Sequence, residues 1–188
     1  MQNLDDYTLI ESYLKGNDAS LEALVQRYLK PMYGFVFSYV KDAQVAEDVT
    51  QEIFLKVWKN LKKIEKNKNF KSWLYTVAKN TALDYLKKKK SIPFSSFEKE
   101  DGRNVLMESL SDIAPLPDKA SEMLQDKRTF LQAIGNLSEK YRQVLLLYYY
   151  NYLNFREIAE ALQEPINTIK SRHRRGLVIL KRGLYHIG

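Results

Sequence analysis

An acidic stretch interrupted by prolines, residues 91–118, constrains the fold of this chain more than any other feature of its sequence. Three prolines, Gly102 and several serines lie in it, and they break any long hydrophobic period. The sequence on either side has few glycines and no sustained alternation of apolar and polar residues, so it lacks strand signals. We therefore predict an all-α protein of two small helical domains, residues 1–90 and 119–188, joined by a flexible linker at residues 91–118.

The charge changes sign along the same divisions. Residues 56–90 contain twelve lysines and two acids, residues 91–126 contain eight acids and three cations, and residues 165–188 contain six cations and no acid. The whole chain has a net charge of +7 and a pI near 9.3. Two basic segments separated by an acidic one favour a polyanionic partner.

Composition excludes several classes of function. The 188 residues include no cysteine, which rules out disulfides, thiolate metal sites and a cysteine nucleophile. His173 and His186 are too few for a histidine-rich metal site or a histidine relay. No apolar run approaches the roughly 20 residues of a membrane span, and the N-terminus has no signal-peptide pattern. We expect a soluble, cytosolic protein without membrane insertion.

Hydrophobic periods and capping residues predict four helices in the N-terminal half. The first should cover residues 5–15 and stop at Gly16, which tolerates positive φ. The second should be capped by Asp18 and kinked or broken at Pro31. A third helix should start at Asp42, followed by a loop from Leu61 to Asn69 and a fourth helix over residues 70–88. The apolar stripe of the third helix is Ala46, Val49, Ile53, Val57 and Leu61, widened by Phe54 and Trp58.

The C-terminal half contains a helix-turn-helix pattern. Helices are expected over residues 119–134 and 138–151, the second capped by Ser138. Asn154 and Glu157 then form a capping-box pattern, so a short helix should begin at Phe155 and end before Pro165. A second, basic helix follows, and its inward-facing residues should be Ile169, Leu177 and Leu180. A short helix, a tight turn and a basic helix are the parts of a helix-turn-helix.

The basic helix has short polar residues first and cations after them. Such a helix fits the DNA major groove, where its N-terminal residues reach base edges and its cations neutralise phosphates. The alternative is a solvated basic face on a helix that only closes a bundle. The predicted DNA contacts are Asn167, Thr168, Lys170, Ser171, Arg172, Arg174 and Arg175.

Three blocks of sequence, in order, resemble one family. Asp42–Leu61, DAQVAEDVTQEIFLKVWKNL, is similar to the polymerase-binding helix of bacterial RNA polymerase sigma factors of the extracytoplasmic-function (ECF) group. Phe70–Lys90, FKSWLYTVAKNTALDYLKKKK, resembles their promoter −10 helix. Leu137–Lys181 resembles their −35-binding domain through LSEKYRQVLLLYY, FREIAEAL and TIKSR. The resemblance implies contacts with the β′ coiled coil and β flap of core RNA polymerase and with promoter DNA, and an anti-sigma factor as a further candidate partner.

The third helix should present an acidic face opposite its apolar stripe. Inside a basic protein, such a face with an exposed leucine suits a cationic protein partner, which the resemblance identifies as the β′ coiled coil. The alternatives are a solvated helix face and a metal site from Asp48 and Glu52. The metal site lacks a third nearby carboxylate, so we expect no metal. The predicted polymerase contacts are Asp48, Gln51, Glu52 and Leu55, with Lys59 on the same face.

The lysine-rich loop and fourth helix have the composition of a single-strand binding surface, with cations for the backbone and rings or polar groups for bases. The resemblance implies that the loop and Asn80 capture −10 bases. The alternative places Trp73 and Tyr75 in the core and has Asn80 satisfy a backbone group. The predicted −10 contacts are Lys62, Lys63, Lys68, Lys71, Asn80, Lys87 and Lys88.

The remaining expectations concern residues around the helix-turn-helix. The tyrosines at 148–152 should be packing for the domain rather than a base-stacking platform. His173 could contact a phosphate. If the turn is left-handed, Gln163 should strain it by roughly 1 kcal/mol, and Glu164 places negative charge near DNA.

These observations favour an ECF-like sigma factor that directs polymerase to promoters, helps to melt the −10 region, catalyses no chemistry itself and needs no cofactor. A free-standing helix-turn-helix regulator leaves the acidic helix and the lysine-rich N-terminal domain unexplained. A metal-dependent nuclease lacks clustered ligands.

Overall fold

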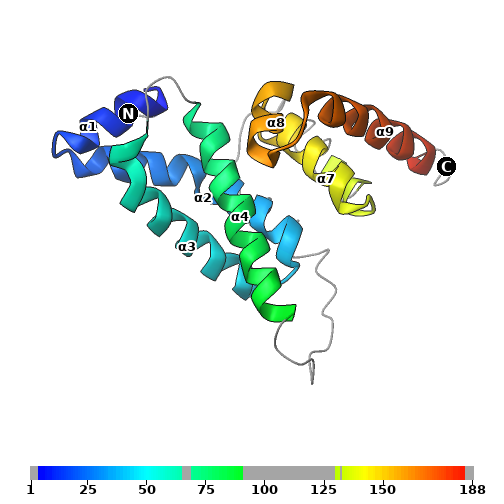
Figure 1. The fold of residues 1–188 in the computed structure, drawn as a ribbon, viewed down its shortest axis with the longest axis horizontal. Coiled ribbons are helices and arrows are strands. Elements are labelled where there is room, and N and C mark those ends of the chain that lie inside the picture. The colour runs from blue at the N-terminus through cyan, green and yellow to red at the C-terminus, as the bar shows by residue number, and fades with distance from the viewer. Residues whose placement is uncertain (1–3, 65–68, 91–129, 132, 185–188) are drawn as a thin grey trace, which may run out of the picture. The chain divides into compact units, whose positions relative to one another are not determined.

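The computed structural model describes residues 4–64, 69–90, 130, 131 and 133–184 (Figure 1), and every regular element in these ranges is helical. Backbone contacts divide the chain into two compact units, Met1–Glu98 and Lys99–Gly188. The predicted all-α class with two helical domains is confirmed. None of the described helices is long and apolar enough to cross a membrane.

The first unit is built around one long helix. Helix α2 (Asp18–Val40) packs against α1 (Asp6–Leu14), α3 (Ala43–Asn60) and α4 (Phe70–Lys90), and α3 and α4 also pack together (Figure 1). A short 3₁₀ turn, η1 (Leu61–Lys63), follows α3. The largest fully buried side chains of the unit are Leu9, Met32, Phe35, Phe37, Ile53, Leu61, Leu74 and Tyr75.

Local capping fixes two of the helix starts as predicted. The Asp5 carboxylate accepts a hydrogen bond from the backbone N–H of Thr8 at 3.0 Å, and the Asp42 carboxylate accepts one from Val45 at 3.0 Å. Each satisfies a backbone donor that the first helical turn leaves without an intrahelical partner. Gly16 ends the first hairpin with φ +98°, a conformation that glycine adopts without strain.

The predicted N-cap of α2 is wrong, and the break that was one of two expected effects of Pro31 does not occur. Its N-cap is Asn17, and Asp18 is already the first helical residue. The helix also continues through Pro31 from Asp18 to Val40 without a break. A proline inside a helix costs about 3 kcal/mol or more. Burial of Tyr28 and Met32 on either side of Pro31 offsets that cost, because packing against three helices holds the backbone in place.

The segment expected to be a loop, Leu61–Asn69, instead begins with the turn η1. Leu61, the first residue of this turn, is buried, so the turn packs its side chain against the core. Residues 65–68 lie outside the described residues. The fourth helix is confirmed and ends two residues later than predicted, at Lys90.

The second unit consists of short helices packed on a long one. Residues 130, 131 and 133–135 are helical, followed by α7 (Glu139–Leu145), a π-helical turn η2 (Leu146–Tyr150), α8 (Phe155–Leu162) and α9 (Ile166–Leu184). Both α7 and α8 pack against α9. The first part of the predicted helix at 119–134 lies outside the described residues. The helix predicted over 138–151 begins after Ser138 as expected but ends as the π turn.

The inward face of α9 differs from the prediction. Ile169 is buried and Leu180 is half-buried, but Leu177 is 37% exposed. Gly176 takes the core-facing position instead. A β-carbon at Gly176 would lie 3.0 Å from Leu145 Cδ1, so α9 approaches α7 more closely than a side chain would allow.

Candidate functional surfaces

The predicted acidic face of α3 is exposed. Asp48, Gln51 and Glu52 face solvent, and Leu55 is 53% exposed. The buried residues Ala46, Val49, Ile53 and Val57 lie on the other side of the helix, which anchors that side in the core. The structure therefore gathers the four predicted polymerase contacts on one solvent-facing surface, and Lys59 is exposed beside them.

Glu52, one of the two predicted acids on this surface, forms an ion pair within its own unit. Glu52 pairs with Lys56 at 2.7 Å, and Lys56 Nζ donates to Thr81 Oγ1 of α4 at 3.1 Å, which ties Glu52 into its own unit.

Burial raises the pKa of Tyr33, and the charges of Glu47 and Asp42 raise it further. The negative field of the N-terminal half of α3 therefore reaches the neighbouring helix.

An exposed tryptophan extends the surface beyond the prediction. Trp58 was expected to widen the buried stripe, but it is 51% exposed and follows Leu55 on α3. Its indole Nε1 donates a hydrogen bond to the Tyr13 hydroxyl of α1. This contact links residues 45 positions apart in the chain, so no local sequence signal could have placed the ring at the surface.

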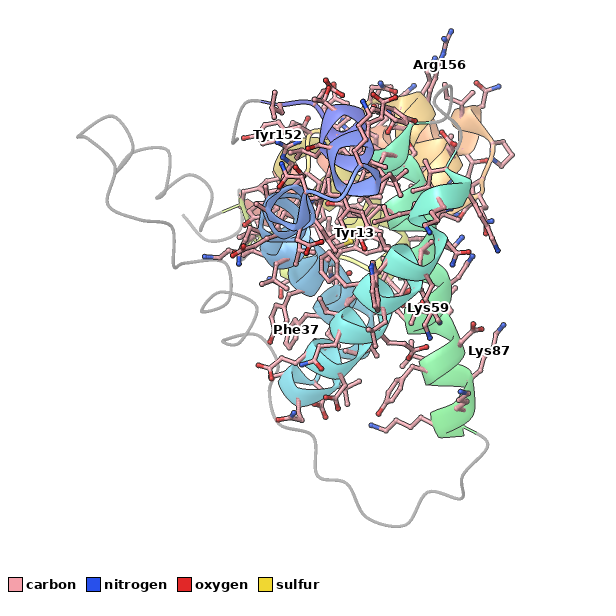
Figure 2. All side chains as sticks on the ribbon, turned by 90° about the vertical axis from the view of Figure 1, so that its left-hand side faces the viewer. Tyr13, Phe37, Lys59, Lys87, Tyr152 and Arg156 are labelled. Atoms are coloured by element: carbon pink, nitrogen blue, oxygen red, sulfur yellow. The ribbon has the colours of Figure 1, made fainter. Side chains whose placement is uncertain are left out.

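The predicted −10 contacts are spread over η1 and the length of α4 and do not form one cluster. Lys62 and Lys63 are exposed on η1, Asn80 is exposed in the middle of α4, and Lys87 and Lys88 are exposed near its end. Lys87 projects from the last part of α4 and Lys59 from α3 (Figure 2). Lys71 is half-buried, and Lys68 lies outside the described residues.

The predicted lysines of α4 do not share one face. Lys71 and Lys87 are about 24 Å apart along the helix axis, and their spacing places them on nearly opposite sides of the helix. Tyr75 is fully buried and Trp73 half-buried, with Trp73 5.9 Å from the Phe70 ring. The core alternative is therefore right for Tyr75.

The capping box of α8 is present as predicted. Asn154 Oδ1 accepts from the backbone N–H groups of Arg156 and Glu157 at 2.9 and 3.0 Å, and Glu157 Oε2 accepts from the Asn154 N–H at 2.7 Å. Gln163 ends the helix in the left-handed conformation, with φ 52° and ψ 46°. The strained turn expected from the sequence is confirmed, and Pro165 directly precedes α9.

The predicted −35 contacts lie on the first half of α9. Five of them are exposed, and Thr168 and Arg172 are half-buried. The Arg172 guanidinium makes a bidentate contact with the Glu164 carboxylate, with two N–O distances of 2.7 Å. A cation eight residues later therefore balances the charge of Glu164, and its expected place near DNA stays a prediction. The exposed residues are Asn167, Lys170, Ser171, Arg174 and Arg175.

His173 packs against an aromatic cluster of its own unit. Its ring lies 4.7 Å from Tyr148, 5.6 Å from Tyr149 and 5.1 Å from Phe155, and its Nε2 is buried without a hydrogen-bond partner among the described residues. Burial lowers the pKa of His173. The phosphate contact suggested for His173 stays a prediction. Tyr148 also stacks on Phe155 at 4.9 Å, so the packing role predicted for the tyrosines is confirmed there.

Sequence reasoning missed a half-buried arginine that joins α7 to the residues before it. Arg142 of α7 donates hydrogen bonds to the carbonyl oxygens of Ile134, Gly135 and Leu137 at 3.3, 3.0 and 2.6 Å. These carbonyls end the preceding helix, so the cation also meets the negative end of its dipole. Burial lowers the pKa of Arg142, while the nearby Glu139 opposes that shift.

Comparison with known proteins decides the family. A model of sigma-70 region 2 matches residues 24–92, and a model of sigma-70 region 4 matches residues 127–180. The chain is 30% identical over 177 residues to the ECF RNA polymerase sigma factor SigW of Bacillus subtilis, covering 93% of this chain and 94% of that protein. This chain is an ECF RNA polymerase sigma factor. It binds core RNA polymerase and directs it to promoters, where transcription starts.

Other relatives agree with this assignment. The RNA polymerase sigma-H factor of Pseudomonas aeruginosa is 33% identical to this sigma factor over 171 residues, which is 89% of this chain and 87% of that one. The structure of CnrH in complex with the cytosolic domain of CnrY shares the fold, with a TM-score of 0.65 at 18% identity over 97% of this chain and 99% of that one. The sigma factor RpoE of Bartonella quintana, solved with the anti-sigma factor NepR, has a TM-score of 0.61 at 20% identity, over 87% and 96% of the two chains.

Proposed function

We propose that this sigma factor binds core polymerase through the exposed face of α3. The observation that carries the proposal is the combination of Asp48, Gln51 and Glu52 with the exposed Leu55 on one helix face. An acidic surface does not help a chain of net charge +7 to bind DNA, because DNA phosphates repel it. Complementary charge around an apolar centre instead gives a protein interface both its speed of association and its specificity. The partner surface is the cationic β′ coiled coil of the polymerase.

We assign the remaining contacts by domain. Residues 1–90 bind polymerase and the −10 element, residues 119–188 bind the −35 element and the β flap, and residues 91–118 connect them. The matched ranges 24–92 and 127–180 support this division. The −10 contacts are Lys62, Lys63, Lys68, Lys71, Asn80, Lys87 and Lys88, and the −35 contacts are Asn167, Thr168, Lys170, Ser171, Arg172, Arg174 and Arg175.

The chain itself catalyses no reaction in this proposal; nucleotide addition belongs to the polymerase. Among the described residues there is no group of three His, Asp or Glu side chains that could hold a metal ion, which gives the metal-dependent nuclease no support. The protein works in the cytoplasm, where polymerase and promoters are. An anti-sigma factor is a further proposed partner, because two solved proteins of this fold are complexes, of CnrH with CnrY and of RpoE with NepR.

Association with purified core polymerase tests the proposal. Asp48→Arg reverses one exposed charge of the α3 face, and we expect it to weaken core binding at least tenfold, since like charges across an interface cost several kcal/mol. Glu22→Arg is the matched control, because Glu22 is an exposed acid on α2 outside the proposed surface. Core binding by Asp48→Arg equal to that of Glu22→Arg would contradict the assignment of α3.

A further inference from the structure

A polar hollow lies between α7 and α9, at the edge of the helix-turn-helix. It has a volume of about 370 Å³ and is open to solvent. Two of its residues come from α7 and five from the first half of α9. They are Lys140, Tyr141, Asn167, Thr168, Ser171, Arg172 and Arg175. Of these, the two α7 residues have no role in the contacts assigned above.

The charge around the hollow is positive. None of its lining residues is an acid. Arg172 is already paired with Glu164 through two contacts of 2.7 Å, which leaves Lys140 and Arg175 as the cations available to a ligand. The acid next to Lys140, Glu139, accepts a hydrogen bond from Gln143 at 2.8 Å on its own helix.

The neutral lining residues can donate to the same ligand. Thr168 and Ser171 carry hydroxyls, Asn167 carries an amide, and Tyr141 carries a phenol. Asn167 and Thr168 also lie in the first turn of α9, where the helix dipole favours negative charge. Two cations and several donors around an acid-free hollow match the oxygens of a phosphate group.

The hollow is continuous with the predicted DNA-reading surface, because five of its seven residues are in the −35 set. A phosphate bound there would lie beside the base-reading residues of α9. In helix-turn-helix complexes, contacts of this kind fix the register of the protein on the duplex without reading its sequence.

We propose that this hollow holds one backbone phosphate of duplex promoter DNA. Lys140 and Arg175 supply its charge contacts, and Arg172 is a positioning residue that Glu164 holds against the turn before α9. The inference rests on the proposed −35 function of the second domain. It adds Lys140 to the DNA-binding surface and takes Arg172 out of the direct phosphate contacts.

The test uses holoenzyme assembled from core polymerase and the full chain, on promoter fragments with one uncharged methylphosphonate linkage placed in turn at each position of the −35 element. On unmodified DNA, Lys140→Ala and Arg175→Ala should each weaken binding about two- to tenfold, the range of one hydrogen-bonded contact. On DNA with the neutral linkage at one position, the same for both variants, that loss should disappear. Lys15→Ala, an exposed lysine of the first unit, should lose nothing on any fragment, and Lys140→Arg should retain binding.

The outcomes separate the hollow from the proposed function. If wild-type holoenzyme prefers promoter DNA but the loss of binding in Lys140→Ala is absent or equal on every linkage, the phosphate assignment of the hollow is overturned and the −35 function is not. Wild-type holoenzyme that does not distinguish a promoter from a scrambled −35 element overturns the −35 function itself. Inhibition of wild type but not of Lys140→Ala by inorganic phosphate at low millimolar concentration, together with a Lys140→Ala loss that is the same on every linkage, assigns the hollow to free phosphate and also overturns the proposal.

The role of Arg172 has its own readout. The double variant Glu164→Ala/Arg172→Ala removes one charge of each sign. We expect it to bind more weakly but to keep the wild-type salt dependence, since no phosphate contact is lost. Lys140→Ala should instead reduce the slope of log K against log salt by about one. A reduction of about one in the Glu164→Ala/Arg172→Ala variant would show that Arg172 contacts a phosphate directly.

Discussion

Replacement of Gly176 by alanine tests the close approach of α7 and α9, on which the geometry of the second unit depends. The new β-carbon would lie 3.0 Å from Leu145 Cδ1, 3.3 Å from Leu145 Cγ and 3.5 Å from Tyr141 Cβ. Leu145 is fully buried, so it can move only by displacing its own neighbours. Overpacking of this kind costs about 1–3 kcal/mol, while the change from glycine to alanine in a helix gains about 0.5–1 kcal/mol.

Gly135→Ala is the matched control. Gly135 is helical, and nothing lies within 4 Å of a β-carbon there, so the control should show the gain in helix propensity without the clash. The higher helix propensity of alanine relative to glycine cancels when the two variants are compared. We therefore expect the Gly176→Ala unit to be less stable than the Gly135→Ala unit by about 1–3 kcal/mol, which lowers the midpoint of a domain of this size by about 4 °C or more.

The assay has to separate the two units. Both tryptophans, Trp58 and Trp73, are in the first unit, so their fluorescence follows that unit alone and serves as an internal reference. Hydrogen exchange of the α7 and α9 amides follows the second unit. Exchange rates in α9 that are the same in Gly176→Ala and Gly135→Ala would refute the argument that glycine is needed for this approach.

Two further predictions concern the surface of α4 and the aromatic cluster. Asn80→Ala should impair open-complex formation more than closed-complex binding, because the exposed amide on α4 is proposed to hold an unpaired base; equal losses in a permanganate footprint and a gel shift would contradict that role. Burial lowers the pKa of His173, so the unfolded chain takes up its proton first as the pH falls. The contribution of His173 should be complete above about pH 6.5 and lost below it. The second unit should therefore melt lower at pH 5.5 than at pH 7.5, with a smaller difference in His173→Phe, and identical differences in the two proteins would refute this.

Features set by neighbouring residues could be predicted from the sequence. The capping box of Asn154 and Glu157 spans three residues, and the structure shows both of its hydrogen bonds. The face of α3 followed from a period of 3.6 residues, which places Asp48 and Glu52 opposite a buried stripe whatever the rest of the fold does.

Features set by distant packing could not be predicted. Pro31 was expected to kink or break a helix, but α2 continues through it without a break, held by contacts with three other helices. Leu177 was expected in the core because it is apolar, yet the approach of Leu145 leaves room only for Gly176 at the core-facing position. Lys140 lies beside α9 because its own helix, α7, packs on α9. No sequence motif near Lys140 could therefore have indicated a place in the proposed DNA-binding surface.

The central claim is that this chain enables core polymerase to start transcription at specific promoters. In vitro transcription measures this directly, with core enzyme from the same bacterium and a library of its genomic fragments as template. With the chain present, we predict RNA 5′ ends at discrete positions that share upstream −35 and −10 sequences, and these transcripts should be lost with Asp48→Arg. The same RNA ends at the same low level with and without the chain would contradict the account.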